Sequence, residues 1–457
     1  MTGYSVLIPE FLLIVGALLA LFAELLPGGD RGAAWMGAVV TLVGALVALL
    51  PTAGIAQPFG GLIVLDGPAR FARVVVLLLG AAWMLWTAGR GEGRVREAVS
   101  LAMFSLVGCM LMAEARELIT LLVSIELATI PAYVLIGYRR GDTKSLEAAI
   151  KYFLMSVLTT LVMLYGFSFV YGLSGSTRYG SIDLTKAGAL GVVAVMLALV
   201  GMFGKLTAAP FHYWAPDAYA GSSPWTVAFV STVPKVAGAV ATVRFVAAIS
   251  PSASTTGLVL AVVAGISMLL GNLAALTQTD MRRLMAYSGV AHSGYLLIGV
   301  AALSRLGFAA AVAYSMAYAF PSMAIMLIAA EEGPQLTDFN GLAQRRPATA
   351  WGLVVVLLSL VGVPPMIGFF GKLNLLLAGQ RASLTTLVII AVAMSVVSAG
   401  YYMRIVRAMF FAEAPASARG QRPSFVAAFA FVMCVAITLV AGLAAGPVYG
   451  SIGSFFH

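Results

Sequence analysis

Long runs of apolar residues dominate the chain, and short polar or charged segments separate them. A run of about 20 apolar residues is what an α-helix needs to cross the hydrocarbon core of a bilayer. Division of the chain at its charged and Gly/Pro-rich breaks predicts fourteen such helices. Their expected bounds are 5–26, 33–50, 71–88, 97–113, 117–137, 148–172, 190–209, 224–248, 257–276, 284–303, 306–330, 348–378, 384–411 and 425–445.

The composition excludes a soluble protein. Of the 457 residues, 61% are hydrophobic and 10% are charged, whereas a soluble domain has roughly 45–50% and about 25%. The longest polar stretches, 331–347 and 412–423, have the size of loops, so one all-α integral membrane domain is expected. The first apolar run is too long for a signal peptide and lacks a basic start, so we expect it to remain in the mature protein.

The distribution of Lys and Arg predicts the orientation of the helices. Fifteen of these residues fall in the loops on one side of the membrane and seven in the loops or nearby helix ends on the other. Because cytoplasmic loops carry the excess of positive charge, both termini are expected outside the cytoplasm, in a multi-pass protein of the cell (inner) membrane. This bias also accounts for the net charge of +9, so no nucleic-acid partner is needed to explain it.

No cofactor is expected within the chain itself. Cys109 and Cys434 stand alone in apolar runs, without the paired spacing that zinc or iron–sulfur sites require. The sequence contains neither a P-loop nor a dinucleotide-binding glycine fingerprint between a strand and a helix. The pattern therefore predicts no metal, flavin or nucleotide site.

Five basic residues remain inside the predicted spans: Lys151, Lys205, Lys235, Arg244 and Lys372. A lysine near the bilayer centre costs about 2.5–3.5 kcal/mol, so it normally faces a protein interior or a wet cavity. Arg244 lies near a helix end and can extend its side chain to the surface, and Lys151 is only one turn into its helix. The other three lysines are therefore the main candidates for a functional site.

Glu126 is the acidic residue expected to accompany these lysines, since it lies nine residues into the fifth span between apolar neighbours. One interpretation is a static ion pair that holds two helices together. The other is a titratable relay, because burial disfavours the charge on a lysine while a nearby carboxylate favours it. A pair about 4 Å apart is worth roughly 4 kcal/mol at an effective dielectric near 20, and one charge moved against 100 mV costs about 2.3 kcal/mol. A switched ion pair is therefore large enough to drive a proton.

Two pairs of similar pentapeptides indicate an internal repeat. Gly-Met-Phe-Gly-Lys ends at Lys205 and Gly-Phe-Phe-Gly-Lys at Lys372, while Tyr-Val-Leu-Ile-Gly begins at Tyr133 and Tyr-Leu-Leu-Ile-Gly at Tyr295. Each pair lies five helices apart, and an odd number of helices reverses the direction through the membrane. This is the inverted-repeat pattern of transporters.

The repeat divides the membrane domain into expected segments. Residues 1–96 would form a three-helix segment, 97–250 the first repeat of helices four to eight, 251–411 the second repeat of helices nine to thirteen, and 412–457 the last helix. Prolines and glycines beside Lys205 and Lys372 predict that the seventh and twelfth helices are broken, because these residues interrupt helical hydrogen bonding.

Two histidines are further candidates. His292 lies in the tenth span, and an intramembrane histidine serves either as a structural hydrogen bonder or as a proton relay. Its place between Lys235 and Lys372 in the sequence favours the relay. His212 lies near the cytoplasmic side, and a structural role and a role in proton entry are equally open for it.

Taken in order, these motifs resemble a known family. Glu126-Leu127 with Pro131 and Tyr133, residues 148–153, 205–217, Pro234-Lys235, 283–295 and 364–372 resemble the antiporter-like subunits of respiratory complex I, and most of all the family of its subunit N. The match covers nearly the whole chain. The resemblance implies a proton channel in the membrane arm, driven by redox chemistry in other subunits.

The resemblance also implies roles for the candidate residues. Glu126 with Lys205 would form an ion-pair switch, Lys235 with His292 the central relay, and Lys372 the gate to the far side. Lys151 and Tyr287 match further polar positions of the family. The implied partners are the other membrane-arm subunits and the lipid bilayer, and FMN, iron–sulfur clusters and quinone would belong to partner subunits.

Two alternatives from other classes stay open. A subunit of a multisubunit sodium/proton antiporter or of a membrane-bound hydrogenase shares the same helices. A channel or scaffold that moves no protons explains the composition but gives no reason for the buried lysines. Neighbouring genes for flavin and iron–sulfur subunits would favour complex I over the antiporter.

Overall fold

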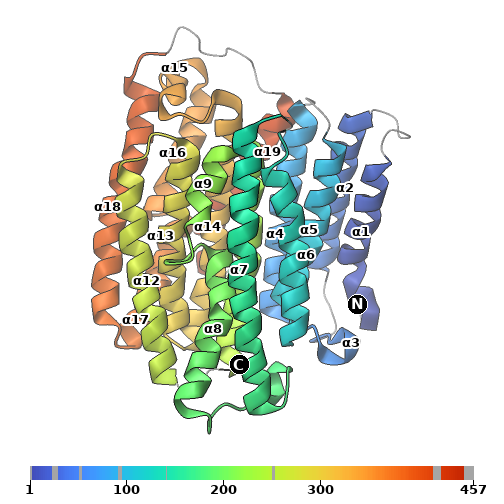
Figure 1. Cartoon of the computed structure of the whole chain (residues 1–457). Helices are drawn as coiled ribbons and strands as arrows, with labels where there is room; N and C mark the ends of the chain where they lie inside the picture. Colours follow the sequence, from blue (N-terminus) through green and yellow to red (C-terminus); the bar gives the residue numbers. More distant parts are fainter. Residues whose placement is uncertain are drawn as a thin grey trace.

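The structure is a computed structural model that describes residues 3–22, 29–50, 54–90, 95–139, 141–249, 253–414 and 424–446. Almost all of these residues lie in helices that run side by side from one end of the molecule to the other (Figure 1). The helices are α1 (Ile8–Leu21), α2 (Gly29–Leu49), α3 (Pro58–Gly61), α4 (Gly67–Arg90), α5 (Arg96–Glu114), α6 (Leu118–Ile136), α7 (Thr143–Ser174), α8 (Gly188–Leu206), α9 (Trp214–Gly221), α10 (Pro224–Val230), α11 (Val233–Ile249), α12 (Ala253–Leu276), α13 (Met281–Ala301), α14 (Arg305–Glu332), α15 (Leu342–Arg345), α16 (Pro347–Val361), α17 (Ile367–Arg381), α18 (Thr385–Phe411) and α19 (Phe425–Leu443).

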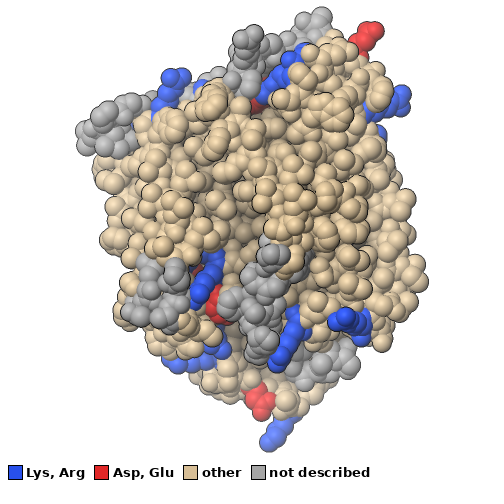
Figure 2. Space-filling view, turned by 180° about the vertical axis from the view of Figure 1, so that it is seen from behind, with Lys and Arg blue, Asp and Glu red and all other residues tan. Residues whose placement is uncertain are grey.

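Thirteen stretches of the described chain are long and apolar enough to cross a membrane. The twelfth predicted span is missing from that count because it is broken into α16 and α17, each of 15 residues and therefore about 22 Å long. Together the two halves complete the fourteen expected crossings. Figure 2 shows charged side chains near the two ends of one face of the molecule and a broad belt without them between, as a bilayer requires.

Helix starts in the loops are fixed by polar caps, because the first N–H groups of a helix have no partner within it. The Asp142 carboxylate accepts hydrogen bonds at the start of α7, and Asp280 does so at the start of α13. The Ser223 hydroxyl caps α10, and Ser304 caps α14. These residues place the helix ends at the surfaces of the bundle.

The centre of the bundle is formed by α14 and by the α10–α11 span, in which the most apolar 18-residue windows are completely buried. The peripheral helices instead expose large apolar side chains, such as Leu158 on α7 and Val396 on α18. Lipid tails are as apolar as the side chains of a protein core. These exposed apolar faces are therefore the sides of the fold that contact lipid or other subunits.

The two spans that were predicted to be broken, the seventh and the twelfth, are interrupted. Helix α8 ends at Leu206, and the next residue, Thr207, adopts a left-handed φ of 59°. Helix α9 begins at Trp214. Helix α16 ends at Val361, and the next residue, Gly362, has a φ of 95°, a conformation that favours glycine. The two lysines lie differently at these breaks: Lys205 precedes one, whereas Lys372 follows the other, because the interrupting prolines come after the first motif and before the second.

An aromatic contact recurs at the spacing of the predicted repeat. The rings of Tyr133 and Tyr152 meet edge to face with centroids 4.8 Å apart, and those of Tyr295 and Tyr314 meet likewise at 6.4 Å. Both members of the second pair lie 162 positions after those of the first. The α6–α7 contact therefore recurs as the α13–α14 contact, five spans later in the chain.

Candidate functional site

The first part of the site lies between α6, α7 and α8. Lys205 is buried, and its Nζ donates a hydrogen bond of 2.5 Å to the Ser156 hydroxyl on α7. Glu126 is half-buried on α6 and accepts a hydrogen bond of 3.0 Å from the Thr160 hydroxyl, one turn further along α7. Among the described residues, no ion pair of 4 Å or less joins Glu126 to Lys205. Two hydroxyl groups on one face of α7 therefore lie where a direct pair was expected.

Lys235 begins the central part, three residues into α11. Its Nζ donates to the Thr207 hydroxyl at 2.9 Å and to the Gly289 carbonyl at 3.0 Å, and it lies 4.7 Å from the centre of the Tyr318 ring. Thr207 is the residue with the left-handed conformation directly after α8. The break in that span therefore brings a hydroxyl from the Lys205 side to the Lys235 ammonium.

His292 follows on α13 and is held entirely by hydroxyl groups. Its Nδ1 shares a hydrogen bond of 2.7 Å with the Tyr314 hydroxyl, and its Nε2 shares one of 3.1 Å with the Tyr402 hydroxyl. Tyr402 also shares a hydrogen bond of 2.6 Å with Ser288. Each ring nitrogen thus has a partner that can donate or accept, so either tautomer of the imidazole can be accommodated.

Lys372 forms the last part, on α17 just beyond the second break. Its Nζ donates to the Val361 carbonyl at the end of α16 at 2.8 Å and to the Ser395 hydroxyl at 3.0 Å. It also lies 4.7 Å from the centre of the Tyr295 ring, whose hydroxyl accepts from Ser395 at 3.3 Å. The carbonyl that the broken helix leaves free is therefore used to hold a buried cation.

We call these groups together the polar series. Among the described residues, no side-chain hydrogen bond joins Thr160 to Ser156 or Lys205 to Thr207, so the series has two gaps. The Tyr318 ring lies 5.1 Å from that of His292, and the His292 ring lies 5.9 Å from that of Tyr295. The series comprises Glu126, Thr160, Ser156, Lys205, Thr207, Lys235, Tyr318, His292, Tyr295 and Lys372.

The other predicted site residues lie outside the contacts of the polar series. Lys151 is about half-exposed, and its Nζ lies 2.7 Å from Glu147 and 3.2 Å from Asp217, which Arg283 also contacts at 2.7 Å. This cluster lines a cavity of about 400 Å³ at the end of the bundle where the loops with the excess of Lys and Arg lie. We call this end the arginine-rich end.

His212 and Tyr287 are also separate from the series. His212 is buried in the turn between α8 and α9, where its ring lies against Tyr213 and its Nδ1 has no hydrogen-bond partner among the described residues. Tyr287 packs at the edge of the hydrophobic core. Arg244, which was expected to reach the surface, instead pairs with Asp66 and donates to the carbonyl of Ala113.

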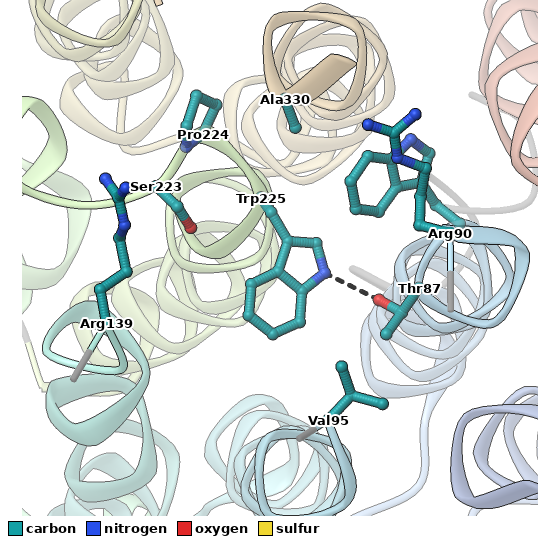
Figure 3. A pocket seen from close by; sticks show the side chains of 9 residues that line it. Thr87, Arg90, Val95, Arg139, Ser223, Pro224, Trp225 and Ala330 are labelled. Atoms are coloured by element: carbon teal, nitrogen blue, oxygen red, sulfur yellow. Dashed lines mark hydrogen bonds between the residues drawn. The ribbon is translucent and has the colours of Figure 1, made fainter. Parts of the chain in front are cut away.

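A second cavity, of about 360 Å³, lies between the ends of α4, α6, α10 and α14 (Figure 3). The Trp225 indole donates across it to the Thr87 hydroxyl at 2.8 Å, and Arg90 and Arg139 lie on opposite sides. No residue of the polar series lines this cavity. In this conformation it is therefore not an opening to the series.

Several residues of the site were not predicted from the sequence. Ser156, Thr207 and the tyrosines are polar at only one atom, and such residues are common in the apolar helices of a membrane protein. The only available signal was their proximity to a lysine or a helix break, as for Thr207, two residues after Lys205. Among the described residues, no group of three or more His, Cys, Asp or Glu side chains could hold a metal ion.

Comparison with known proteins identifies the family. The family model described as "NADH:quinone oxidoreductase/Mrp antiporter, TM" matches residues 115–398. NADH-quinone oxidoreductase subunit N of Rhodobacter capsulatus is 36% identical, covering 96% of this chain and 95% of that protein. Subunit N 2 of Opitutus terrae is 35% identical with the same coverage of both chains.

Solved structures agree with the sequence relatives. A chain of respiratory complex I from Thermus thermophilus with bound aureothin has a TM-score of 0.85 and 30% identity, covering 97% of this chain and 99% of that one. A chain of the Mrp complex from Dietzia shares the fold, with a TM-score of 0.82 at 22% identity. The predicted resemblance and fold class are confirmed. This chain belongs to the NADH:quinone oxidoreductase/Mrp antiporter family and is a full-length relative of subunit N.

Proposed function

We propose that this chain is a proton-translocating membrane-arm subunit of an NADH:quinone oxidoreductase. Electron transfer from NADH to quinone takes place in other subunits of this enzyme, which hold the FMN, the iron–sulfur clusters and the quinone. This chain contributes the proton path, with the polar series as its central part. Its partners are the other membrane-arm subunits and the bilayer.

One observation carries the proposal: the ammonium groups of Lys205, Lys235 and Lys372 are all buried, yet their nearest partners are neutral hydroxyls, carbonyls and rings. A buried lysine that pairs with a carboxylate is held in its charged form, because loss of its proton would leave the carboxylate as an unpaired buried charge. Neutral partners do not hold a lysine in its charged form in this way. Lys235 and Lys372 can therefore release and take up protons without leaving a carboxylate unpaired, whereas Lys205 also has Glu126 nearby.

The switch that we propose at one end of the series involves Glu126 and Lys205. In this structure Thr160 and Ser156 hold the two side chains one helical turn apart. A change of rotamer that brings the charges to about 4 Å would contribute roughly 4 kcal/mol at an effective dielectric near 20. Forming and breaking this pair changes how tightly Lys205 holds its proton, and Thr207 passes the change towards Lys235.

The remaining predicted residues take positions along the same path. Lys235 and His292 form the central relay, and Lys372 is the gate to the far side. Lys151, which lines the cavity at the arginine-rich end, and His212, in the turn between α8 and α9, are proposed for the approach of protons from the cytoplasm. Tyr287 is proposed as a further polar position beside the relay.

The orientation follows from the charge bias of the loops. We propose that the chain lies in the cell (inner) membrane with the arginine-rich end, at the top of Figure 1, in the cytoplasm and both termini on the other side. Met1 and His457 themselves lie outside the described residues. The segments 1–96, 97–250, 251–411 and 412–457 remain our proposed division of the domain.

The test is proton pumping by the assembled complex in vesicles. We expect Lys205→Ala or Glu126→Ala to reduce the proton flux strongly, since each removes one member of the switch. The matched control is Lys186→Ala, which removes an exposed lysine in the loop before α8. Normal flux in both Lys205 and Glu126 variants would rule out the switch.

A subunit of a multisubunit sodium/proton antiporter is the second candidate, and the shared fold of the Dietzia Mrp chain favours it. The two candidates differ in the subunits that accompany the chain. Purification of the native complex with flavin and iron–sulfur subunits is expected for the oxidoreductase. A complex that contains only small membrane subunits would support the antiporter instead.

A further inference from the structure

We propose that Glu10, Arg73 and Glu114 form a second proton-binding site, separate from the polar series, in which the two carboxyl groups share one exchangeable proton. The three residues come from α1, α4 and α5. None of them belongs to the proposed path of proton translocation, so this inference does not rest on the proposed function.

The geometry brings the three side chains into direct contact. Arg73 Nη2 lies 2.5 Å from Glu10 Oε1 and 2.7 Å from Glu114 Oε1, and Arg73 Nε also donates to Glu114 Oε1 at 3.1 Å. Arg73 Nη1 donates to the Val6 carbonyl at 2.8 Å. The exposed fractions are 5% for Glu10, 3% for Arg73 and 0% for Glu114, so water does not screen these charges.

The charges of this cluster do not balance. Two carboxylates face a single guanidinium, and among the described residues Arg73 is the only basic side chain that forms an ion pair with either of them. With both carboxylates ionised the site would hold one uncompensated buried negative charge, which costs several kcal/mol. One additional positive charge must therefore be bound there.

The positions of the two carboxyl groups indicate where the additional positive charge binds. Both Oε1 atoms lie within 2.7 Å of the same nitrogen, Arg73 Nη2, so the two carboxyl groups are neighbours. The second oxygen of each group, Oε2, has no hydrogen-bond partner among the described residues. Two ionised carboxylates in contact repel, whereas one shared proton turns the contact into a hydrogen bond. A proton satisfies the charge and the unpaired oxygens together.

The site lies at the end of the bundle opposite the arginine-rich loops. Glu10 is in the first turn of α1 and Glu114 is the last residue of α5, and both helix ends lie near α3 at the bottom of Figure 1. Directly behind Glu114, a cavity of about 460 Å³ is lined by Asp66, Arg116 and Arg244. Val64 also lines that cavity, and its N–H donates to the Glu114 carbonyl at 2.9 Å, so the cavity lies next to the backbone of Glu114 and offers the proton a route to water.

The test is infrared spectroscopy on the purified, assembled complex, which detects the carbonyl stretch of a protonated carboxyl group. We expect Glu10→Gln to remove one carboxylic-acid band, because a neutral amide replaces the shared acid. In deuterium oxide the wild-type band should shift, because the proton exchanges. The matched control is Glu97→Gln at the other end of α5, where the carboxylate lies 3.6 Å from Arg96 and no band should be lost.

A second variant keeps the test decisive. Glu114→Gln is expected to remove the same band, and both single variants are expected to assemble, since each leaves one carboxylate for Arg73. Retention of every carboxylic-acid band in both variants would show that neither carboxyl group is protonated and would overturn the proposal. Failure of both variants to assemble would also overturn it, because a site that holds only one negative charge should tolerate the loss of either carboxyl group. A band that does not shift in deuterium oxide, or that sodium ions abolish, would also overturn it, because the bound charge would then be a trapped proton or a metal cation.

Discussion

Gly289 offers a way to disturb Lys235 without altering any charge. The Gly289 carbonyl accepts a hydrogen bond from the lysine, and a methyl group added to this glycine would lie 2.8 Å from Lys235 Nζ and 2.9 Å from the Tyr318 hydroxyl. Ordinary contacts of a methyl carbon begin at about 3.4 Å. The Gly289→Ala variant must therefore push the ammonium away by about 0.6 Å, the difference between these two distances.

The size of the effect follows from the contacts that the ammonium would lose. Lys235 Nζ makes two hydrogen bonds, of 2.9 Å and 3.0 Å, and both are short enough for such a displacement to weaken them. A hydrogen bond to a charged group contributes about 1.5–3 kcal/mol. Loss of one of them changes the population of the bound position by about 10- to 100-fold, since each 1.4 kcal/mol is a factor of ten.

The assay is the initial rate of proton pumping by the assembled complex in vesicles, normalised to the amount of intact complex. We expect Gly289→Ala to pump at about a tenth of the wild-type rate or less. Gly238→Ala on α11 is the matched control, because its added methyl would meet Lys205 Cβ at an ordinary 3.6 Å. If the Gly289 and Gly238 variants pump equally well, then Lys235 is not a member of the path.

Two further predictions concern the hydroxyl on α7 and the second helix break. Ser156→Ala removes the 2.5 Å hydrogen bond to Lys205 and is expected to lower pumping by about tenfold, whereas Ser168→Ala, on the exposed face of the same helix, should leave it unchanged. Gly368→Ala would place a methyl 1.8 Å from the backbone carbonyl of Ser359, and the forced separation of α16 and α17 should cost at least about 1–3 kcal/mol and reduce the melting temperature or the yield of complex.

The control for the second of these is Gly172→Ala near the end of α7, where an added methyl would meet no atom within 4 Å. This variant should match the wild type in both yield and melting temperature. Wild-type stability of the Gly368 variant would mean that the packing of α16 against α17 adjusts more easily than the structure indicates. A loss of pumping in the Ser168 variant would equally contradict the assignment of Ser156.

The spans and the three buried lysines could be predicted because both depend on a strong energetic rule. Apolar runs of bilayer length have few alternatives, and a lysine inside one needs a protein interior. Arg73 was one of the seven basic residues counted with the loops and nearby helix ends on the side opposite the arginine-rich loops, and was therefore expected near the surface. It is in fact buried, since Glu10 and Glu114 from two other helices supply the compensating charge.

The detailed contacts of the site could not be predicted, for two physical reasons. Helix α14 is buried on every side, so no periodicity of polar residues reveals which face carries Tyr314 and Tyr318. The partners of Lys151 and Lys205 depend on how helices distant in the sequence meet. Lys151 therefore lies in an exposed ion-pair cluster, and Lys205 contacts a serine rather than the predicted glutamate.

The two tyrosine pairs, Tyr133–Tyr152 and Tyr295–Tyr314, can be compared with each other within one molecule. Tyr152 and Tyr314 occupy corresponding positions of the duplicated halves, but only Tyr314 has its hydroxyl on a histidine. The position that corresponds to His292 is Ile130, on the outer surface of α6. Of the variants Tyr152→Phe and Tyr314→Phe, only the second removes a hydroxyl group from a histidine, so the difference between their effects isolates the contribution of that hydroxyl.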